Sequence, residues 1–557
     1  MDVNIRVAGE AGQGVQTTGN LLVSTLASMR IHVFATQSYM SRIRGGLNWF
    51  DIRIGDEELF SGKEAADLLV ALTREALETL RPKVSEHGAI LYDGPAEDGA
   101  ISIEFSKLAK EVAGTAIAAN SVAAGAVFAL LGYDIQKLCD YLKIAFKKKG
   151  EEVIEKNIAC AQRGAEQIAS QGRSIPSPAG GQAPEHVYSG TEAVGLAAAA
   201  AGIKLVCSYP MTPSTGVFQY LASVADQYGI VVEQAEDEIA AINLVCGASY
   251  AGAPAMTTTS GGGFALMVEG LALAGMMELP VLVLLSQRPG PATGLPTRTA
   301  QQDLAFAVHA GHGEFPRAIF APGTIEQAHK ITRHALQTAH TYQVPVILMT
   351  DQFLVDAAKN LDPLETAPRP IDRHLAKDPS ADYVRYAVTA DGVSPRALPG
   401  SSAFVVCDSD EHTEDGHITE DLDAHIRLQD KRMRKEKGLA ADFVEPEFYG
   451  PKDAEHLLLT WGSTYGPARE AVDILHRKGI SAAMLHFAQV WPIDGARVKS
   501  ILQPGTAKRK LTSIEGNSTG QFASVLREVG ALTECALMLK YDGMPFTGGG
   551  IAERILQ

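Results

Sequence analysis

The feature that most constrains the fold is an alternation of short apolar runs with longer helical runs. In the first part of the chain, runs rich in apolar and β-branched residues fall at 3–8, 32–37, 49–54, 68–72 and 89–94. Helical runs lie between them, and alternating strand and helix signals are typical of α/β domains. The sequence therefore predicts a doubly wound α/β domain, followed by further helices to about residue 169.

The same alternation returns after residue 190. Strand-like runs occur at 231–234, 255–260, 281–287, 317–322 and 344–351. Several of these runs are apolar without interruption, as expected for parallel strands that are covered on both faces. A smaller third group occupies 456–463, 482–488 and 511–517. We therefore predict a multidomain α/β protein built on doubly wound parallel sheets.

Shifts in composition divide the chain into five parts, which are residues 1–171, 172–187, 188–365, 366–450 and 451–557. The second part is rich in Gly, Pro and Ser and has no apolar period, which predicts an interdomain linker. The fourth part is an irregular connection with an acidic run at 408–423 and a basic run at 427–438. We expect the charges of both runs to face water.

Composition argues against several kinds of partner. The 557 residues are 46% hydrophobic and 20% charged, which is ordinary for a soluble globular protein. The net charge is -16 and no large basic patch is visible, so we expect neither nucleic acid nor anionic membrane as a partner. The first residues lack the basic and apolar runs of a signal peptide, so we expect none, and Glu269, Glu278 and Pro280 interrupt the longest apolar stretch. We expect a cytoplasmic protein.

The chain contains six cysteines, and none lies within four residues of another: Cys139, Cys160, Cys207, Cys246, Cys407 and Cys535. This spacing does not fit the local motifs that bind zinc or iron–sulfur clusters. We therefore expect buried, reduced thiols and no metal bound by this chain, so that any redox cluster belongs to another chain.

Two turns place polar groups where predicted parallel strands end. The first, YPMTPST at 209–215, has two prolines that fix the backbone, at a position where α/β sheets bind ligands. From the residues alone, a plain turn with Thr212 or Ser214 as helix N-cap is the favoured interpretation. The second turn begins at Arg288, which is placed to grip a carboxylate with two hydrogen bonds, or equally to form a surface salt bridge.

A glutamate shares the apolar face of a predicted helix at 233–253. Ile242 and Val245 recur at helical spacing, and Glu238 lies four and seven residues before them. A buried carboxylate requires a partner and is a candidate acid or base. The alternative is a favourable interaction with the helix dipole. The run TTTSGGG at 257–263 then lets the backbone approach a ligand closely, although this signal is weak alone.

The turn after the first strand, GEAGQG, is rich in glycine but matches neither GxGxxG nor the Walker motif. It opens a helix, and Gly12 and Gly14 expose backbone amides to an anion. A tight packing turn without a ligand is an equal alternative.

Together, these motifs resemble the alpha subunits of 2-oxoacid:ferredoxin oxidoreductases. YPMTPST matches the family signature YPxTPST, and the glutamate helix, the hydroxyl/Gly loop, QRPGPATGLPT and QQDL follow in register. GEAGQGV and SRIRGGLNWFDIRI are similar to the family's gamma domain. The resemblance implies a gamma-type domain at 1–171, a thiamine pyrimidine-binding domain at 188–365 and a transketolase C-terminal-like domain at 451–557.

The resemblance also implies a site shared between two chains. Thiamine diphosphate would lie between this chain and a beta subunit that holds the diphosphate, its Mg²⁺ and a 4Fe-4S cluster. Glu238 would bond to the pyrimidine N1′ and activate the cofactor, Thr212 would contact the substrate, and Arg288 would hold its carboxylate. The other residues implied to bind the cofactor are Tyr209, Pro210, Ser260, Gly261 and Gly262.

The implied reaction converts a 2-oxoacid and coenzyme A to an acyl-CoA and CO₂, reversibly, with electrons passed to ferredoxin. Gamma before alpha is the order of 2-oxoglutarate-type enzymes, which favours 2-oxoglutarate and succinyl-CoA, with Arg298 as a second cation. Pyruvate, branched-chain or aryl 2-oxoacids are alternatives, as is a CoA- or nucleotide-binding regulatory module. We expect an αβ pair, usually α2β2. Residues expected near coenzyme A are Gly9, Glu10, Gly12, Gln13, Gly14, Arg42 and Arg44.

Overall fold

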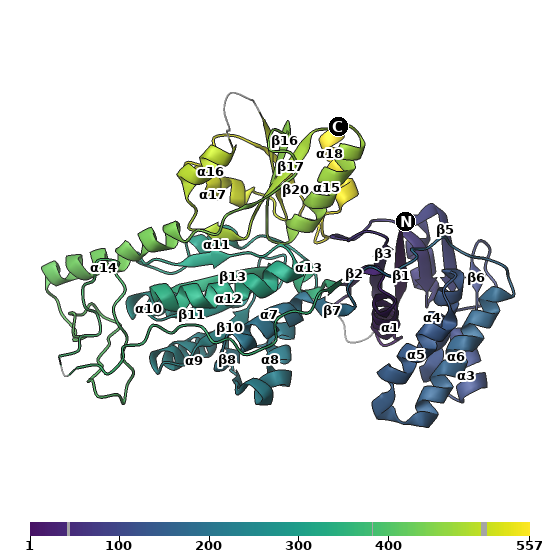
Figure 1. Ribbon diagram of the computed structural model, residues 1–557, viewed down its shortest axis with the longest axis horizontal. Coiled ribbons are helices and arrows are strands. Elements are labelled where there is room, and N and C mark those ends of the chain that lie inside the picture. Colours follow the sequence, from purple (N-terminus) through teal and green to yellow (C-terminus); the bar gives the residue numbers. More distant parts are fainter. Residues whose placement is uncertain (42–44, 381, 503–508) are drawn as a thin grey trace. The chain divides into compact units, whose positions relative to one another are not determined.

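The computed structural model describes residues 1–41, 45–380, 382–502 and 509–557. The chain divides into two compact units (Figure 1). The first unit contains residues 1–189, 356–363 and 547–549, and the second contains 190–355, 364–546 and 550–557. Within the described ranges, no helix combines the length and apolar character needed to cross a membrane.

The first unit is built on an eight-stranded sheet in the order β6-β5-β4-β1-β3-β2-β14-β7. Its strands β6, β5, β4 and β1 run parallel, whereas the other half of the sheet is antiparallel. The short connection between β2 and β3 explains this difference from the predicted parallel sheet, since a parallel pair needs a long crossover. The α/β prediction is confirmed. The strands are β1 (Asp2–Glu10), β2 (His32–Ser38), β3 (Leu47–Gly55), β4 (Ala66–Ala71), β5 (Val84–Tyr92), β6 (Ile101–Ser102), β7 (His186–Ser189) and β14 (Ala358–Leu361).

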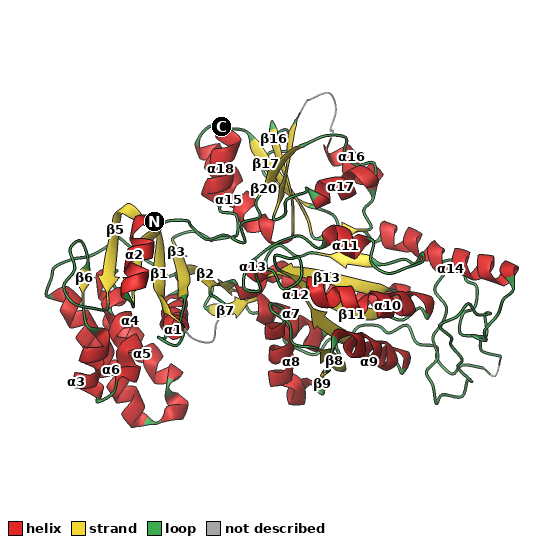
Figure 2. Cartoon of the chain, turned by 180° about the vertical axis from the view of Figure 1, so that it is seen from behind, coloured by secondary structure: helices red, strands yellow, loops and turns green. Residues whose placement is uncertain are grey.

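Helices cover the two faces of this sheet unequally. Leu68 and Val70 of β4 point into a large core, whereas Leu69 and Ala71 point into a smaller one on the other face, as strand alternation requires. The helix α2 (Arg74–Leu80) packs on the smaller core. The larger core is formed with α1 (Val15–Ser28), α3 (Phe105–Ala113), α4 (Ala119–Leu130), α5 (Ile135–Ala145) and α6 (Glu151–Ala169), and Figure 2 shows α3 to α6 as one bundle.

The second unit contains a seven-stranded sheet in the order β18-β12-β13-β11-β10-β8-β9. All of its strands run parallel except β18, which confirms the predicted parallel sheet. Every residue of β11 and β13 is buried, which explains why both read as uninterrupted apolar runs. The strands are β8 (Leu205–Ser208), β9 (Val231–Gln234), β10 (Ala255–Thr259), β11 (Val281–Gln287), β12 (Ala318–Phe320), β13 (Pro345–Asp351) and β18 (Gln489–Trp491).

Two groups of helices contact this sheet. Helix α7 packs with both α8 and α12, and α9 packs with α10. Because β8, β10 and β11 are neighbouring parallel strands, the segments that follow Ser208, Thr259 and Gln287 begin at the same edge of the sheet. The helices are α7 (Gly190–Ala200), α8 (Thr215–Tyr228), α9 (Glu238–Tyr250), α10 (Gly261–Met276), α11 (Leu304–Val308), α12 (Ile325–Tyr342) and α13 (Gln352–Asp356).

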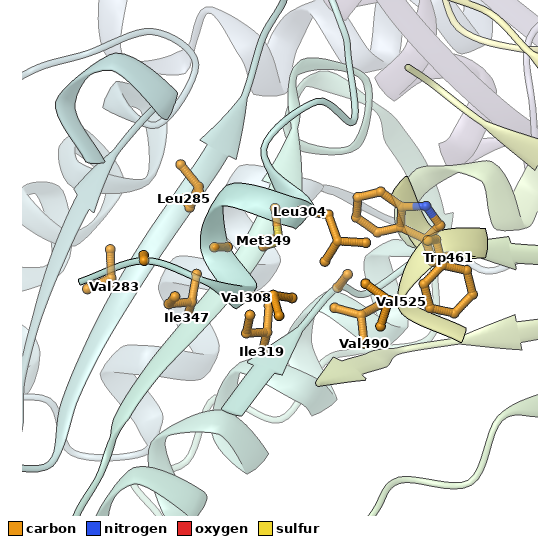
Figure 3. Close-up of a cluster of buried hydrophobic side chains, with 14 of the residues drawn as sticks. Val283, Leu285, Leu304, Val308, Ile319, Ile347, Met349, Trp461, Val490 and Val525 are labelled. Atoms are coloured by element: carbon orange, nitrogen blue, oxygen red, sulfur yellow. The ribbon is translucent and has the colours of Figure 1, made fainter. Parts of the chain in front are cut away.

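A five-stranded sheet in the order β15-β17-β16-β19-β20 completes the second unit. Its core is continuous with that of the seven-stranded sheet, and Figure 3 shows Trp461, Val490 and Val525 beside Leu304 and Ile319. The elements are β15 (Glu447–Tyr449), β16 (His456–Trp461), β17 (Ala482–Phe487), β19 (Lys510–Glu515), β20 (Ala536–Leu539), α15 (Tyr465–Arg477), α16 (Gly495–Leu502), α17 (Gln521–Glu528) and α18 (Gly548–Leu556).

The basic run expected to face water forms α14 (Leu422–Ala441), and two of its lysines are buried. Lys431 Nζ lies 2.6 Å from Glu278 Oε1, and Lys435 pairs with the other oxygen of the same carboxylate. Burial alone would raise the pKa of Glu278, but Lys435, Lys431 and Arg385 outweigh it and hold the pKa below its usual range. The expectation of solvated charges is therefore wrong here, because Glu278 provides a buried counter-charge.

Candidate active site

Glu238 is the first residue of α9, but it does not cap the helix. The N-cap is Asp237, whose carboxylate accepts a hydrogen bond from Ala240 N at 2.7 Å. Glu238 is 4% exposed, and its Oε1 has no hydrogen-bond partner in the described part of the chain. A buried carboxylate oxygen without a partner is costly. The arrangement therefore suits a donor from outside the chain and not the helix-dipole alternative.

Glycines at the start of α10 make room for two carboxylates. A Cβ on Gly263 would lie 2.5 Å from Glu238 Oε1, and a Cβ on Gly261 would lie 2.7 Å from both carboxylate oxygens of Asp303. Ser260, which precedes the helix, has a buried hydroxyl without a partner among the described residues. Gly262 is exposed, and its nearest neighbour for a Cβ is Ala292 O at 3.8 Å. The start of α10 thus presents backbone and hydroxyl groups between two acids.

Asp303 was not singled out from the sequence. Its Oδ2 is enclosed and has no partner within the described ranges, and its backbone N donates to Gln287 Oε1 at 3.0 Å. Burial raises the pKa of Asp303 to about 6, although Arg288 acts in the opposite direction. The QQDL motif contains this aspartate, but no local pattern marks it as buried, because Gly261 lies far away in the sequence.

Arg288 connects the end of β11 to the turn after β8. Its Nη1 donates a hydrogen bond to Thr212 O at 2.7 Å. Burial lowers the pKa of Arg288, and Asp303 opposes this effect. The guanidinium forms no ion pair with any described residue, so the surface salt bridge considered from the sequence is not present. Arg288 is half-buried and lies close enough to Asp303 to influence the pKa of that carboxyl group.

The turn after β8 leads into helix α8, which begins at Thr215 and has Ser214 as its N-cap residue, one of the two positions favoured from the sequence. The Ser214 hydroxyl does not cap the helix amides, because it donates to Met211 O at 2.8 Å. Tyr209 is 40% exposed, and Pro210 and Thr212 are half-buried. The contacts described above therefore bring Thr212, Arg288, the start of α10 and Glu238 to one edge of the sheet.

Arg298 is placed differently. Its backbone N donates to Leu295 O at 3.1 Å, and its Cβ is 3.0 Å from the position of a Cβ on Gly543, in the loop after β20. Burial lowers the pKa of Arg298. This arginine therefore packs beside the C-terminal sheet of the same unit.

The turn between β1 and α1 forms a separate site in the first unit. Gly12 and Gly14 have φ values of 91° and 81°, in the left-handed region that glycine adopts readily. Gly14 is also the N-cap of α1 and provides no side-chain cap, so the first amides of the helix remain available to a ligand. Gly9 packs against Gln13, whose Oε1 accepts a hydrogen bond from Glu10 N at 2.9 Å.

This turn lines a cavity of about 790 Å³. Asn120 forms part of its wall and lies so close to the turn that a Cβ on Gly14 would be 2.2 Å from Asn120 Oδ1. Burial raises the pKa of Asp93, another lining residue, to about 6. Of the residues predicted to contact coenzyme A, Arg42 and Arg44 lie outside the described residues. Those that line the cavity are Glu10, Gly12, Gln13 and Gly14.

The cysteines are free thiols, and four of the six are buried, whereas Cys407 and Cys535 are partly exposed. The expectation that all are buried is therefore wrong for these two. In the described part of the chain, no three His, Cys, Asp or Glu side chains gather as a group that could hold a metal ion.

Comparisons with known proteins agree in both units. A family model described as "Pyruvate flavodoxin/ferredoxin oxidoreductase, thiamine diP-bdg" matches residues 196–431, and one described as "Pyruvate ferredoxin/flavodoxin oxidoreductase" matches residues 4–167. The chain is 30% identical to a 2-oxoacid:ferredoxin oxidoreductase subunit alpha of Saccharolobus solfataricus, over 100% of this chain and 97% of that relative. It is 29% identical to the 2-oxoglutarate oxidoreductase subunit KorA of Mycobacterium tuberculosis, over 100% of this chain and 91% of that relative.

A solved structure is also similar along the whole chain. It is the 2-oxoglutarate:ferredoxin oxidoreductase from Magnetococcus marinus with 2-oxoglutarate, coenzyme A and succinyl-CoA bound. The TM-score is 0.92 at 31% sequence identity, and the similarity covers 100% of this chain and 99% of that one.

Proposed function

Because this chain belongs to the 2-oxoacid:ferredoxin oxidoreductases as an alpha subunit, we propose that with a beta subunit it converts 2-oxoglutarate and coenzyme A to succinyl-CoA and CO₂ and passes the electrons to ferredoxin. The observation that carries the proposal is the buried, unpartnered Oε1 of Glu238 at the edge of the thiamine-type domain. The choice of 2-oxoglutarate follows the similar structure, which holds that substrate.

The residues present fit the pyrimidine of thiamine diphosphate. Glu238 Oε1 and Ser260 Oγ are both buried and lack partners in the described chain, and an aminopyrimidine offers donors and acceptors to such atoms. When bound, thiamine supplies an acidic ring carbon that adds to the keto group and accepts the electrons released with CO₂. Glu238 would hold a proton at N1′ of the pyrimidine through a hydrogen bond, which favours the imino form of the ring, in which the 4′-nitrogen can act as a base.

Arg288 is suited to hold the carboxylate of the oxoacid. One of its N–H groups is committed to Thr212 O, which fixes the guanidinium at the end of β11. Its other N–H groups form no hydrogen bond with described residues and can engage a carboxylate in bidentate fashion. Arg298 is a second cation of the same unit for the distal carboxylate of 2-oxoglutarate, and Tyr209, Pro210, Thr212, Gly261 and Gly262 are the remaining contacts that we assign to this site.

We assign coenzyme A to the cavity at the β1–α1 turn. The backbone amides at the start of α1 have no side-chain cap and suit the diphosphate of the coenzyme. Gly12 keeps the approach open, since nothing lies within 4 Å of a Cβ placed there. Glu10, Gln13 and Gly14 line the same cavity, and Gly9 packs against Gln13 in the same turn.

We assign the remaining parts of the reaction to the beta subunit. The sequence has no GDG…N diphosphate motif of thiamine enzymes and no closely spaced cysteines. The beta subunit therefore contributes the diphosphate site with Mg²⁺ and the 4Fe-4S cluster, in an αβ pair that is doubled to α2β2. The complex works in the cytoplasm.

Reduction of a viologen dye by the purified αβ complex tests this function, with coenzyme A and a panel of 2-oxoglutarate, pyruvate and 3-methyl-2-oxobutanoate. We expect 2-oxoglutarate to give the highest kcat/KM. Glu238→Gln should lower kcat by about 100- to 10,000-fold without affecting assembly. Glu236→Gln is the control, because this nearby glutamate is exposed. Full turnover in Glu238→Gln would contradict the proposed role, and a preference for pyruvate would contradict the substrate.

A further inference from the structure

Asp303 lies where β10 and β11 end, at the same edge of the sheet as Arg288. Its backbone N donates to Gln287 Oε1 at 3.0 Å, and its backbone O accepts from Ala307 N at 2.8 Å. Both of its carboxylate oxygens would lie 2.7 Å from a Cβ on Gly261, at the start of α10. Backbone hydrogen bonds and the close approach to a glycine therefore fix the position of this carboxylate.

The segment that carries Asp303 is also held by the C-terminal sheet of the same unit. Gln521, the first residue of α17, donates to Gln302 O at 2.7 Å and accepts from Ala305 N at 3.0 Å. These two bonds lie on either side of Asp303. The carboxylate therefore belongs to a rigid segment, although its Oδ2 is enclosed and has no hydrogen-bond partner in the described chain.

Few charged groups surround Asp303. Arg288, after β11, lowers the pKa of Asp303, but burial outweighs this effect and raises the pKa to about 6. Glu238 contacts α10 at Gly263, two residues beyond the contact with Asp303. Helix α11 carries no ionisable residue, and Gln521, through which α17 contacts this segment, is neutral. Among the described residues, Arg288 is therefore the charged group that acts on Asp303.

A carboxylate bound to Arg288 would change the environment of Asp303 in two ways. It would neutralise the guanidinium that favours the ionised form of Asp303, and it would bring a second negative charge to a site with little water. Both changes favour the protonated form of a carboxyl group. A protonated carboxyl group also gains an O–H donor, which the unpartnered Oδ2 can offer to the bound carboxylate.

We propose that Asp303 takes up one proton from water when the carboxylate of the 2-oxoacid binds to Arg288, and returns it when that carboxylate leaves as CO₂. The inference rests on the proposed function, in which Arg288 holds this carboxylate. On binding, the proton adds to Asp303 and no other bond forms or breaks. When the carbon–carbon bond breaks, its electron pair stays on the acyl carbon, neutral CO₂ departs, and Asp303 loses the proton to water. The summed charge of Arg288, Asp303 and the bound carboxylate is thus the same before, during and after occupancy.

Proton uptake on binding is measured by isothermal titration calorimetry of the αβ complex with thiamine diphosphate, at pH 7 in two buffers of different ionisation enthalpy, PIPES and imidazole. The ligand is N-oxalylglycine, which has both carboxylates of 2-oxoglutarate but an amide carbon, resistant to addition, in place of the keto carbon. We expect an uptake of about 0.5–0.9 proton per ligand in the wild type and less than about 0.2 in Asp303→Asn. Glu528→Gln, an exposed acid of α17, is the control and should keep the wild-type uptake.

The affinity should depend on pH in the corresponding direction. Between pH 6.5 and 7.5, the Kd of the wild-type complex for N-oxalylglycine should rise about 6-fold, because the proton required for binding becomes scarcer. In Asp303→Asn the rise should be less than about 2-fold, since the amide donates a hydrogen bond without titrating. Binding without proton uptake in the wild type, or the same uptake in Asp303→Asn, would overturn the inference. The wild-type measurement tests it even if the variant fails to fold.

A second ligand separates this inference from the choice of substrate. Oxamate has the first carboxylate and the adjacent carbonyl group of every 2-oxoacid but no distal carboxylate, so it should also bind with proton uptake. Uptake with oxamate in a complex that neither binds N-oxalylglycine nor reduces dye with 2-oxoglutarate would contradict the proposed substrate and support the role of Asp303. Dye reduction with 2-oxoglutarate, together with analogue binding that takes up no proton, would overturn the role of Asp303 alone. A complex that binds neither analogue would contradict both.

Discussion

Substituting Gly263 with alanine tests whether the position of the Glu238 carboxylate controls turnover. A Cβ at Gly263 would lie 2.5 Å from Glu238 Oε1 and 2.2 Å from Thr259 Oγ1. A carbon–oxygen contact is normally about 3.3 Å, so the carboxylate oxygen has to move by about 0.8 Å. Because a shift of about 1 Å in a catalytic group can cost about 100-fold in rate, we expect kcat of the αβ complex to fall by about 100-fold.

The stability of Gly263→Ala should change little, because two effects oppose each other. Alanine is favoured over glycine inside a helix by about 0.5–1 kcal/mol. Three atoms are in the way, Thr259 Oγ1, Glu238 Oε1 and Glu238 Cγ, and all belong to side chains. Moving a side chain off its preferred rotamer costs about 0.5–1.5 kcal/mol. We therefore expect the free energy of unfolding to stay within about 1 kcal/mol of the wild-type value, so that lost turnover cannot be attributed to unfolding.

The assays are viologen reduction with 2-oxoglutarate and coenzyme A for kcat, and urea unfolding followed by circular dichroism for stability. Gly247→Ala is the matched control, because Gly247 lies on α9 and nothing is within 4 Å of a Cβ placed there. The control should keep the wild-type kcat and gain up to about 1 kcal/mol of stability. If Gly263→Ala unfolds normally and keeps more than half of the wild-type kcat, the reasoning from carboxylate position is refuted.

Two further predictions concern buried charges and are measured by urea unfolding. Burial raises the pKa of Asp303 to about 6, so the folded state binds the carboxyl proton of Asp303 more tightly than the unfolded chain does. The contribution of Asp303 to the free energy of unfolding is therefore full at low pH and falls by about 3 kcal/mol as the pH rises from about 4 to 6. Asp303→Asn removes this fall, so its stability relative to the wild type should increase over that range, and a pH-independent difference would contradict the assignment. Glu278→Gln leaves Lys431 and Lys435 buried without their carboxylate and should cost about 3–5 kcal/mol at pH 7. Glu365→Gln, in an exposed pair, should cost less than about 1 kcal/mol, and equal losses in the two variants would argue against a buried charge cluster.

The predicted strands agree with the structure where burial on both faces of a strand requires an uninterrupted run of apolar residues. β11 and β13 are buried at every position and read directly as apolar runs. The short strands β14 and β18 were not predicted. Their residues, AKNL and QVW, carry no period of their own, and their conformation follows from pairing with β2, β7 and β12.

The same distinction applies to the site. Glu238 could be found because its position on an apolar helical stripe is a local property, and its burial agrees with that prediction. Asp303 could not be found, since its burial depends on Gly261 from another segment. Lys431 and Lys435 lie in a run of charges that resembles a solvated helix face. Their burial depends on ion pairs with Glu278, which lies far earlier in the chain and could not be inferred from the local sequence.

Helix α10 links the buried charges to the proposed chemistry. Its first turn accommodates Glu238 through Gly263, and its middle packs closely on α9, because a Cβ on Gly270 would lie 2.6 Å from Ile242. Glu278 follows the other end of the helix and is held by two lysines of α14. A side chain at Gly270 would push the two helices apart, and loss of the ion pairs would free the far end of α10. The position of the Glu238 carboxylate therefore depends on the whole length of α10, and the buried ion cluster of α14, remote in sequence, is part of what fixes it.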